Sequence, residues 1–414
     1  MKLVRLEGLR GVAALTVVIA HLAPMTDARV SLGPFLGLCS WGRAAVITFF
    51  ILSGVVIRLA YDRRPRGRLD FLGDRAVRLL PLYYTALGVA VLVHLALVGP
   101  PDLWTVLGHL IFLQSDDRHV LVPLWTNEPL WSLSYEIFFY LLFAATIGSR
   151  QKTGIAVWAV VAVATIGVQW LVPREGFGRF CVSLPGYSLL WVLGYYLHDI
   201  ARVMAVGRVT ALGAATLVPL ASRVEIPGFE DPAAGDILAG IALAPLFVHT
   251  LQVEALHVIP GRRLPMSCLA WGFVLLLALT ALPTSAIPRA RLPHIILPLV
   301  AIPGFILASR WLGWPSRANR PALFLGRISY ALYVIHFPIM RLADTLPAGF
   351  WVRAACYLCA SFVTAILLED YFQRSVVRWL RGRAPMRAPS DTHAGSYFGL
   401  ESRTAGLAAR SPES

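Results

Sequence analysis

Apolar runs long enough to cross a membrane, or nearly so, follow one another along most of this chain. A bilayer core offers no water to the backbone, so a segment that crosses it must satisfy its own hydrogen bonds, as a helix does. The runs lie at residues 8–25, 44–61, 79–98, 130–148, 154–172, 184–199, 207–221, 236–252, 267–283, 294–312, 325–342 and 350–369. We therefore expect an all-α polytopic membrane protein with about 10 to 12 transmembrane helices.

Composition agrees with this class. Charged residues make up 14% of the chain, against about 25% in soluble domains. The run at 103–114 is too short to span and is expected to be re-entrant or interfacial. We expect one membrane domain over residues 1–380. Residues 381–414 are rich in Pro, Ser, Ala, Gly and Arg without apolar periodicity, which predicts a disordered tail.

The distribution of charge orients the chain in the membrane. The net charge is +14, and arginines crowd the segment 58–78, whereas 99–129 and 222–236 are acid-rich. Since basic loops stay on the cytoplasmic side, both termini are predicted to be cytoplasmic. Arg289 and Arg291 are an exception that this scheme places outside. Because the positive charge lies between apolar runs, it indicates membrane topology and not nucleic-acid binding.

The first apolar run carries two ionisable residues, Arg10 and His21. Eleven helical positions correspond to roughly 16 Å and about three turns, so both side chains lie on nearly the same face. Ionisable groups inside a span are costly and indicate function. The alternative is that Arg10 reaches lipid head groups while His21 lies at the far interface.

Two arginines, Arg75 and Arg78, precede the run that begins at Leu79. Residues at positions i and i+3 share a helix face, and guanidinium groups match phosphate oxygens in a bidentate manner. The pair is a candidate site for a polyphosphate such as that of coenzyme A, at the cytoplasmic end of the span. Arginines in this position also anchor helices and set topology, and spacing alone leaves that alternative open.

Glu136 lies at the start of a span, in LWSLSYEIFFYLLF, with Ser132 nearby. A carboxylate inside a membrane needs a partner, and we expect His21 to be that partner. The alternative is a partly hydrated glutamate at the outer interface. Ser53 precedes Gly54 within FFILSGVVI; without a G-x-S-x-G context, close helix packing is favoured over a nucleophilic role.

A second intramembrane histidine, His336, occurs in LGRISYALYVIHFPI with Tyr330 and Tyr333. These side chains are candidates to line a polar cavity, or else to form an interfacial belt. Pro338 is expected to kink this helix. No cluster has zinc-site spacing and no glycine-rich phosphate loop is present, so no metal is expected.

Five motifs, in order over residues 5 to 370, resemble those of the acyltransferase 3 family of integral membrane acyltransferases. The opening helix reads LEGLRGVAALTVVIAH, similar to the family's LDGLRGIAALLVVLYH, with Glu7 in place of Asp. FFILSGV resembles FFxLSGF, with Val55 in place of Phe. The arginine pair that follows the second span matches Arg75 and Arg78.

The remaining motifs lie further along the chain. WSLxxExxFY is present in full around Glu136, and LGRISYALYVIHFP resembles LGxISYxLYLxHxP. A late glutamate, which in the family usually precedes a basic residue and proline, corresponds to Glu369; here Asp370 and Tyr371 follow it.

The resemblance implies transfer of an acyl group, usually acetyl, from cytoplasmic acyl-CoA to a hydroxyl. The implied acceptors are sugars of surface polysaccharide, lipopolysaccharide, peptidoglycan or Nod factors, or glycosylated metabolites such as macrolides. It also implies an enzyme of the bacterial inner membrane in which Arg10, His21, Arg75 and Arg78 matter for activity. His21 is then expected to act as general base or to carry the acyl group briefly. The competing hypothesis is a transporter or flippase of a glycolipid, with the same polar interior as its pathway.

Overall fold

A computed structural model gives the three-dimensional arrangement of the chain. It describes residues 3–115, 121–148, 151–168, 171, 177–207, 211, 214–215, 218–221, 232–256 and 319–383. Apart from an isolated β-bridge between Gln114 and Leu121, the regular structure of these residues is helical. The runs predicted at 267–283 and 294–312, and all of the predicted tail beyond Arg383, lie outside the described residues.

The helices follow the apolar runs. The longer ones are α1 (Val4–Ala20), α4 (Gly42–Arg63), α5 (Arg68–Leu97), α7 (Trp131–Thr146), α8 (Gln151–Val168), α9 (Phe177–Val203), α12 (Pro232–Leu251), α15 (Asn319–Asp344) and α16 (Phe350–Leu367). The shorter elements are α2 (Ala28–Leu32), η1 (Gly33–Phe35), α3 (Leu36–Cys39), α6 (Leu103–Leu110), η2 (Trp125–Leu130), α11 (Val218–Ala221), η4 (Gln252–Leu256), η7 (Leu368–Gln373) and α17 (Arg374–Arg383).

Membrane-spanning character is found in several of these helices. Within the described part of the chain, five stretches are long and apolar enough to cross a membrane: Leu36–Arg63, Arg68–Leu97, Gly235–Leu256, Arg320–Asp344 and Phe350–Leu380. The prediction of an all-α membrane fold is confirmed. The short run at 103–114 forms only α6 and a turn, a helix too short to span.

Helix α5 begins earlier than the apolar run it contains. It starts at Arg68, so Arg75 and Arg78 lie within the helix and not before it. Asp70 in the first turn favours this early start, because a negative charge complements the helix dipole there. The arginines are therefore held on a rigid helical face.

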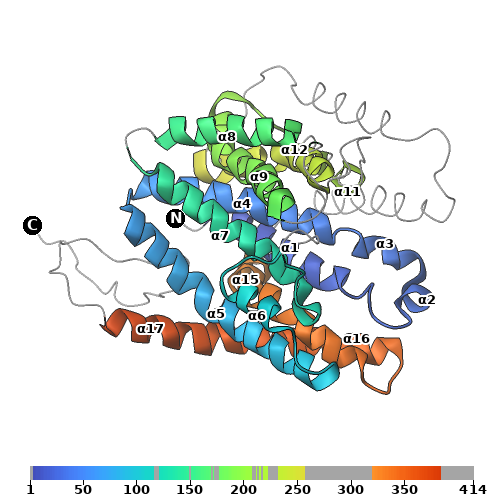
Figure 1. Cartoon of the computed structure of the whole chain (residues 1–414). Coiled ribbons are helices and arrows are strands. Elements are labelled where there is room, and N and C mark those ends of the chain that lie inside the picture. The colour runs from blue at the N-terminus through green and yellow to red at the C-terminus, as the bar shows by residue number, and fades with distance from the viewer. Residues whose placement is uncertain are drawn as a thin grey trace, which may run out of the picture.

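Helices α1 and α4 lie at the centre of the molecule (Figure 1), between α5, α15 and α16 on one side and α8, α9 and α12 on the other. The most extensive contacts join α1 to α15 and α4 to α9. Glycines allow both approaches. A Cβ at Gly11 would lie 2.7 Å from the backbone nitrogen of Gly326, and a Cβ at Gly326 would lie 2.5 Å from the carbonyl oxygen of Glu7. Backbones this close need small residues.

Glycines also allow α4 and α9 to approach each other closely. A Cβ at Gly54 would collide with the carbonyl oxygen of Trp191, and one at Gly194 with that of Ile51. The motif glycines of the sequence are thus packing residues, which supports the packing interpretation of the Ser53–Gly54 pair.

Replacing Gly54 with leucine is expected to destabilise the protein strongly. Overpacking of a core costs about 1–3 kcal/mol when side chains can move, and here the obstacle is backbone. Gly88→Leu is the matched control, since a Cβ at Gly88 on α5 would meet nothing within 4 Å. Thermal unfolding followed by size-exclusion chromatography compares the two. Equal melting temperatures would contradict the role of Gly54 in this crossing.

Candidate functional site

His21 caps the C-terminal end of α1, where its backbone N–H bonds to the Val17 carbonyl. Its Nδ1 lies 2.8 Å from the same carbonyl oxygen, and His336 Nε2 from α15 lies 3.1 Å from Nδ1. The ring centroids are 5.0 Å apart, and His336 is fully buried. The packing of α1 on α15 thus brings together two histidines that are 315 positions apart in the sequence.

Pro338 shapes this part of α15. A proline has no backbone N–H, so the carbonyl of Val334 lacks its helical donor. The Asn127 side chain supplies one, with Nδ2 2.9 Å from the Val334 oxygen. This bond ties η2 to α15 beside the histidine pair.

A cavity of about 590 Å³ adjoins His21, a size typical of small-molecule sites. Its wall includes His21, Arg43, Trp125, Glu128, Trp131 and Tyr333. The Arg43 guanidinium lies 5.2 Å from the Trp131 ring centre, and its Nε is 3.0 Å from the buried carboxylate of Asp236. The wall therefore combines aromatic faces with fixed charge.

Glu128 supplies the acidic group of this wall. It lies in η2, before α7, and Arg341 Nη2 is 3.2 Å from its Oε1. Burial raises the pKa of Glu128, and the Arg341 guanidinium opposes that rise. Arg341 also lies 4.0 Å from the Trp125 ring centre.

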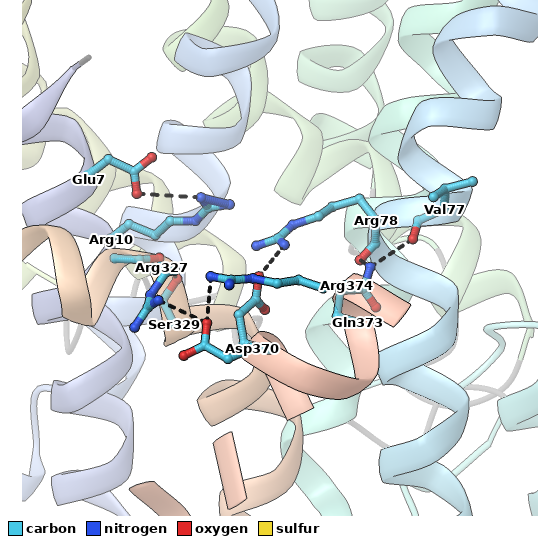
Figure 2. A network of polar contacts seen from close by, with 11 residues as sticks. Glu7, Arg10, Val77, Arg78, Arg327, Ser329, Asp370, Gln373 and Arg374 are labelled. Atoms are coloured by element: carbon cyan, nitrogen blue, oxygen red, sulfur yellow. Dashed lines mark hydrogen bonds and ion pairs between the residues drawn. The ribbon is translucent and has the colours of Figure 1, made fainter. Parts of the chain in front are cut away.

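Arginines and carboxylates form a second polar cluster, which we call the arginine cluster (Figure 2). Arg78 Nη1 lies 2.5 Å from Glu369 Oε1, and Arg10 lies 4.0 Å from Glu7. Arg327 and Arg374 each lie 2.9 Å from Asp370 Oδ1. Glu369 and Asp370 belong to the π-helical turn η7, which brings the carboxylates to the arginines.

Arg75 differs from its neighbours in this cluster. Its guanidinium lies 5.4 Å from the ring centres of both Phe71 and Tyr140, and its buried Nε has no hydrogen-bond partner. Among the described residues, no carboxylate forms an ion pair with it. The aromatic rings therefore position the Arg75 guanidinium, and its hydrogen-bond donors stay available for an anionic ligand.

Glu136 has a partner other than the one expected. The Tyr140 hydroxyl donates to its Oε1, one helical turn away on α7, and the Ser53 hydroxyl lies beside Tyr140. The charges that act on Glu136 are those of Arg10, Arg75 and Arg78. The expected direct bond between His21 and Glu136 is absent from the described contacts. Residues at i and i+4 share a helix face, which is why Tyr140 reaches Glu136 first.

Tyrosines link the cavity to the arginine cluster. Tyr333 lines the cavity, and its hydroxyl lies 2.6 Å from Ser132 Oγ and 2.9 Å from the Pro129 carbonyl. The Tyr330 hydroxyl donates to the Leu79 carbonyl at 3.0 Å. Both tyrosines lie within electrostatic range of Glu136. Polar groups therefore extend from the cavity beside His21 toward the arginines.

Sequence reasoning missed several members of these clusters. Arg43, Asp236, Arg327 and Asp370 were not singled out as site residues. A signal existed for two of them, because Arg327 lies inside the LGRISY motif and Asp370 directly follows Glu369. The pair of Arg43 and Asp236 joins α4 to α12 and has no local sequence signature.

Comparison with known proteins gives a family match over most of the chain. The profile of the acyltransferase 3 family, described as an acyltransferase domain, matches residues 3–370. Exopolysaccharide production protein ExoZ of Rhizobium meliloti (strain 1021) is 34% identical over 193 residues, covering 37% of this chain and 60% of ExoZ. Acyltransferase MdmB of Streptomyces mycarofaciens is 32% identical over 206 residues, covering 46% of this chain and 52% of MdmB. The matches thus span between half and two thirds of each relative. No solved structure matches the chain.

Proposed function

This multi-pass membrane protein belongs to the acyltransferase 3 family, and we propose that it transfers an acyl group, with acetyl as the first candidate, from cytoplasmic acyl-CoA to a hydroxyl of a sugar-containing acceptor. The observation that carries the proposal is the placement of His21. It lines a ligand-sized cavity at one end of a series of polar side chains whose other end is the arginine cluster. Such an arrangement suits a long donor with phosphates at one end and a thioester at the other.

The donor phosphates would bind at the arginine cluster. Arg75 offers unpaired hydrogen-bond donors, and Arg10 and Arg78 lie near the same carboxylate, Glu136. Guanidinium groups bind phosphate oxygens in a bidentate manner. The pantetheine arm would then extend past Tyr330 and Tyr333 toward His21.

His21 would perform the chemistry. In direct transfer, its unprotonated nitrogen accepts the proton of the acceptor hydroxyl while that oxygen attacks the thioester carbonyl. The carbon–sulfur bond breaks, and the departing thiolate takes this proton from His21, which leaves an ester, free CoA and neutral His21. In the two-step route, the same nitrogen first attacks the thioester carbonyl, the carbon–sulfur bond breaks and CoA leaves as the thiolate. The acceptor hydroxyl then attacks the acyl-imidazole, its proton passes to that thiolate, and the bond between the acyl carbon and His21 breaks, which leaves the ester, free CoA and neutral His21.

The acceptor would occupy the cavity. Trp125 and Trp131 provide aromatic faces, and Glu128 provides hydrogen-bond acceptors for hydroxyl groups. The name of ExoZ refers to exopolysaccharide production, so a surface polysaccharide is the first acceptor class to test, followed by lipopolysaccharide and glycosylated metabolites. We place the protein in the inner (plasma) membrane with both termini in the cytoplasm.

The proposal is tested with purified protein in lipid nanodiscs and radiolabelled acetyl-CoA. The acceptor source is a glycan and metabolite extract from a strain that lacks the gene. We expect release of CoA and an alkali-labile label on a component of the extract, which mass spectrometry then identifies. Failure to consume acetyl-CoA, together with movement of a glycolipid across vesicle membranes, would indicate the competing transporter function.

Replacing Glu136 with glutamine is expected to lower turnover roughly tenfold, equivalent to about 1.4 kcal/mol in the barrier. The substitution keeps the shape and the acceptor for Tyr140 but removes the charge that faces Arg10, Arg75 and Arg78. Activity of a general base rises with pH as the base loses its proton. In Glu136→Gln, the pH range over which activity rises should be the same as in the unsubstituted protein, because His336 and not Glu136 contacts His21. Rates measured from about pH 3 to 8, a range that includes and extends below that of free histidine, decide this, and a shifted profile would restore the expected His21–Glu136 coupling.

A further inference from the structure

The hydrogen bonds around the buried His336 indicate its role. We infer that His336 is a positioning residue that holds His21 with its proton on Nδ1, so that the lone pair of Nε2 serves the transfer reaction. This inference rests on the proposed function for the use of Nε2, but the assignment of the protons rests on hydrogen bonds alone.

The first step is the protonation state of His336. Its Nδ1 lies 2.7 Å from the carbonyl oxygen of Tyr333 and 3.1 Å from that of Leu332. A carbonyl oxygen only accepts, so Nδ1 of His336 must carry a hydrogen. In a neutral imidazole the other nitrogen, Nε2, is then an acceptor.

The second step transfers this constraint to His21. The Nδ1 of His21 faces two groups, the Val17 carbonyl at 2.8 Å and His336 Nε2 at 3.1 Å. Both are acceptors, so a single arrangement satisfies them: His21 donates its Nδ1 hydrogen to both, as a three-centre bond. A proton on His336 Nε2 would instead leave the Val17 oxygen facing a lone pair. Neutral His21 is thereby left with Nε2 unprotonated.

The third step is the rigidity of the pair. His336 is fully buried, and Phe337 packs edge-on against His21 with ring centroids 4.9 Å apart. The glycine crossing of α1 and α15 at Gly11 and Gly326 holds the two helices close. Together with the Val17 carbonyl, His336 therefore fixes the ring orientation of His21 as well as its tautomer, the role that a carboxylate performs in the Ser-His-Asp arrangement.

Two amide substitutions separate these contributions. In His336→Gln, the side-chain amide oxygen can take the position of Nε2 and accept the hydrogen of His21 Nδ1. In His336→Asn, the shorter amide reaches only the position of Nδ1, so no acceptor replaces Nε2. Full-length protein labelled with ¹⁵N-histidine in nanodiscs reports tautomers through its ring-nitrogen shifts, and the His21 signals are assigned by their loss in His21→Ala. His109 is an internal reference, since its Nδ1 lies 2.7 Å from the Thr105 carbonyl and its Nε2 accepts from the Leu124 N–H.

We expect His21 in the unsubstituted protein and in His336→Gln to show the Nδ1-protonated pattern of His109. His336→Asn should show an Nε2-protonated fraction and a lower turnover of acetyl-CoA with unchanged donor affinity. The fall should be smaller than the roughly 10²-fold minimum for loss of a general base. A protonated Nε2 on His21 in the unsubstituted protein would overturn the inference, as would an asparagine variant identical to it in tautomer and turnover. Since the tautomer is read without substrate, this test stands even where acetyl-CoA proves not to be the donor.

Discussion

His21→Ala is expected to abolish acyl transfer while the protein still folds and inserts into the membrane. Loss of a general base costs about 10²–10⁴ in rate, and loss of a covalent carrier removes the reaction path altogether. The substitution removes the imidazole from the cavity wall but keeps the backbone cap of α1, whose N–H bond to Val17 does not involve the side chain. Labelled product formed by the nanodisc-reconstituted variant measures the loss.

His94→Ala is the matched control for this experiment. His94 also lies near a helix end and also bonds a backbone carbonyl through Nδ1, that of Gly99, but it belongs to α5 and is not part of the cavity wall. It should retain normal turnover. Near-normal transfer by His21→Ala would refute the assigned chemistry, whatever the behaviour of His336.

Arg75→Ala is expected to weaken acyl-CoA binding by about 10- to 100-fold, since hydrogen bonds to charged groups contribute about 1.5–3 kcal/mol. Arg75 has no ion pair among the described residues, so its removal leaves no carboxylate without a partner. Arg75→Lys should recover little of the affinity, because lysine lacks the planar fork. Calorimetric titration with CoA at low and high salt measures the effect, and the loss should be smaller at high salt, where exposed charge pairs are screened.

Arg78→Ala should weaken CoA binding as well, but it also leaves Glu369 buried without its partner. Its unfolding temperature should therefore fall, which is not expected for Arg75→Ala. The double substitution of Arg78→Ala with Glu369→Gln should recover stability without recovering CoA affinity. Unchanged affinity in both single variants would make these arginines topological anchors only.

The helical class and the motif order could be predicted from the sequence because both depend on local patterns. Lipid forces an apolar run to form a helix, and the i, i+3 spacing of Arg75 and Arg78 is a property of that helix. The pairing of Glu136 with Tyr140 has the same local origin and was available from the i, i+4 spacing. The prediction that His21 is the partner of Glu136 does not take into account that Tyr140 is nearer.

Other features required contacts between distant segments. Glu369 and Asp370 are visible in the sequence as a pair of acids where the last apolar run ends. Only the π-helical turn η7 and the approach of α5 and α15 bring them to Arg78 and Arg327. The cavity likewise draws its wall from α1, α4, η2, α7 and α15. No spacing within one helix encodes such an arrangement.

The sequence by itself determined the membrane-embedded helical class, the family motifs and the presence of Arg10 and His21 on one helix. The tertiary structure decided which groups touch His21. That contact depends on the glycine-mediated crossing of α1 and α15, which carries His336 to within 3.1 Å of the His21 ring. A hydrogen bond is made or lost within a few tenths of an ångström. The partner of the central histidine is therefore set by how closely two backbones pack, a property that residue order alone does not express.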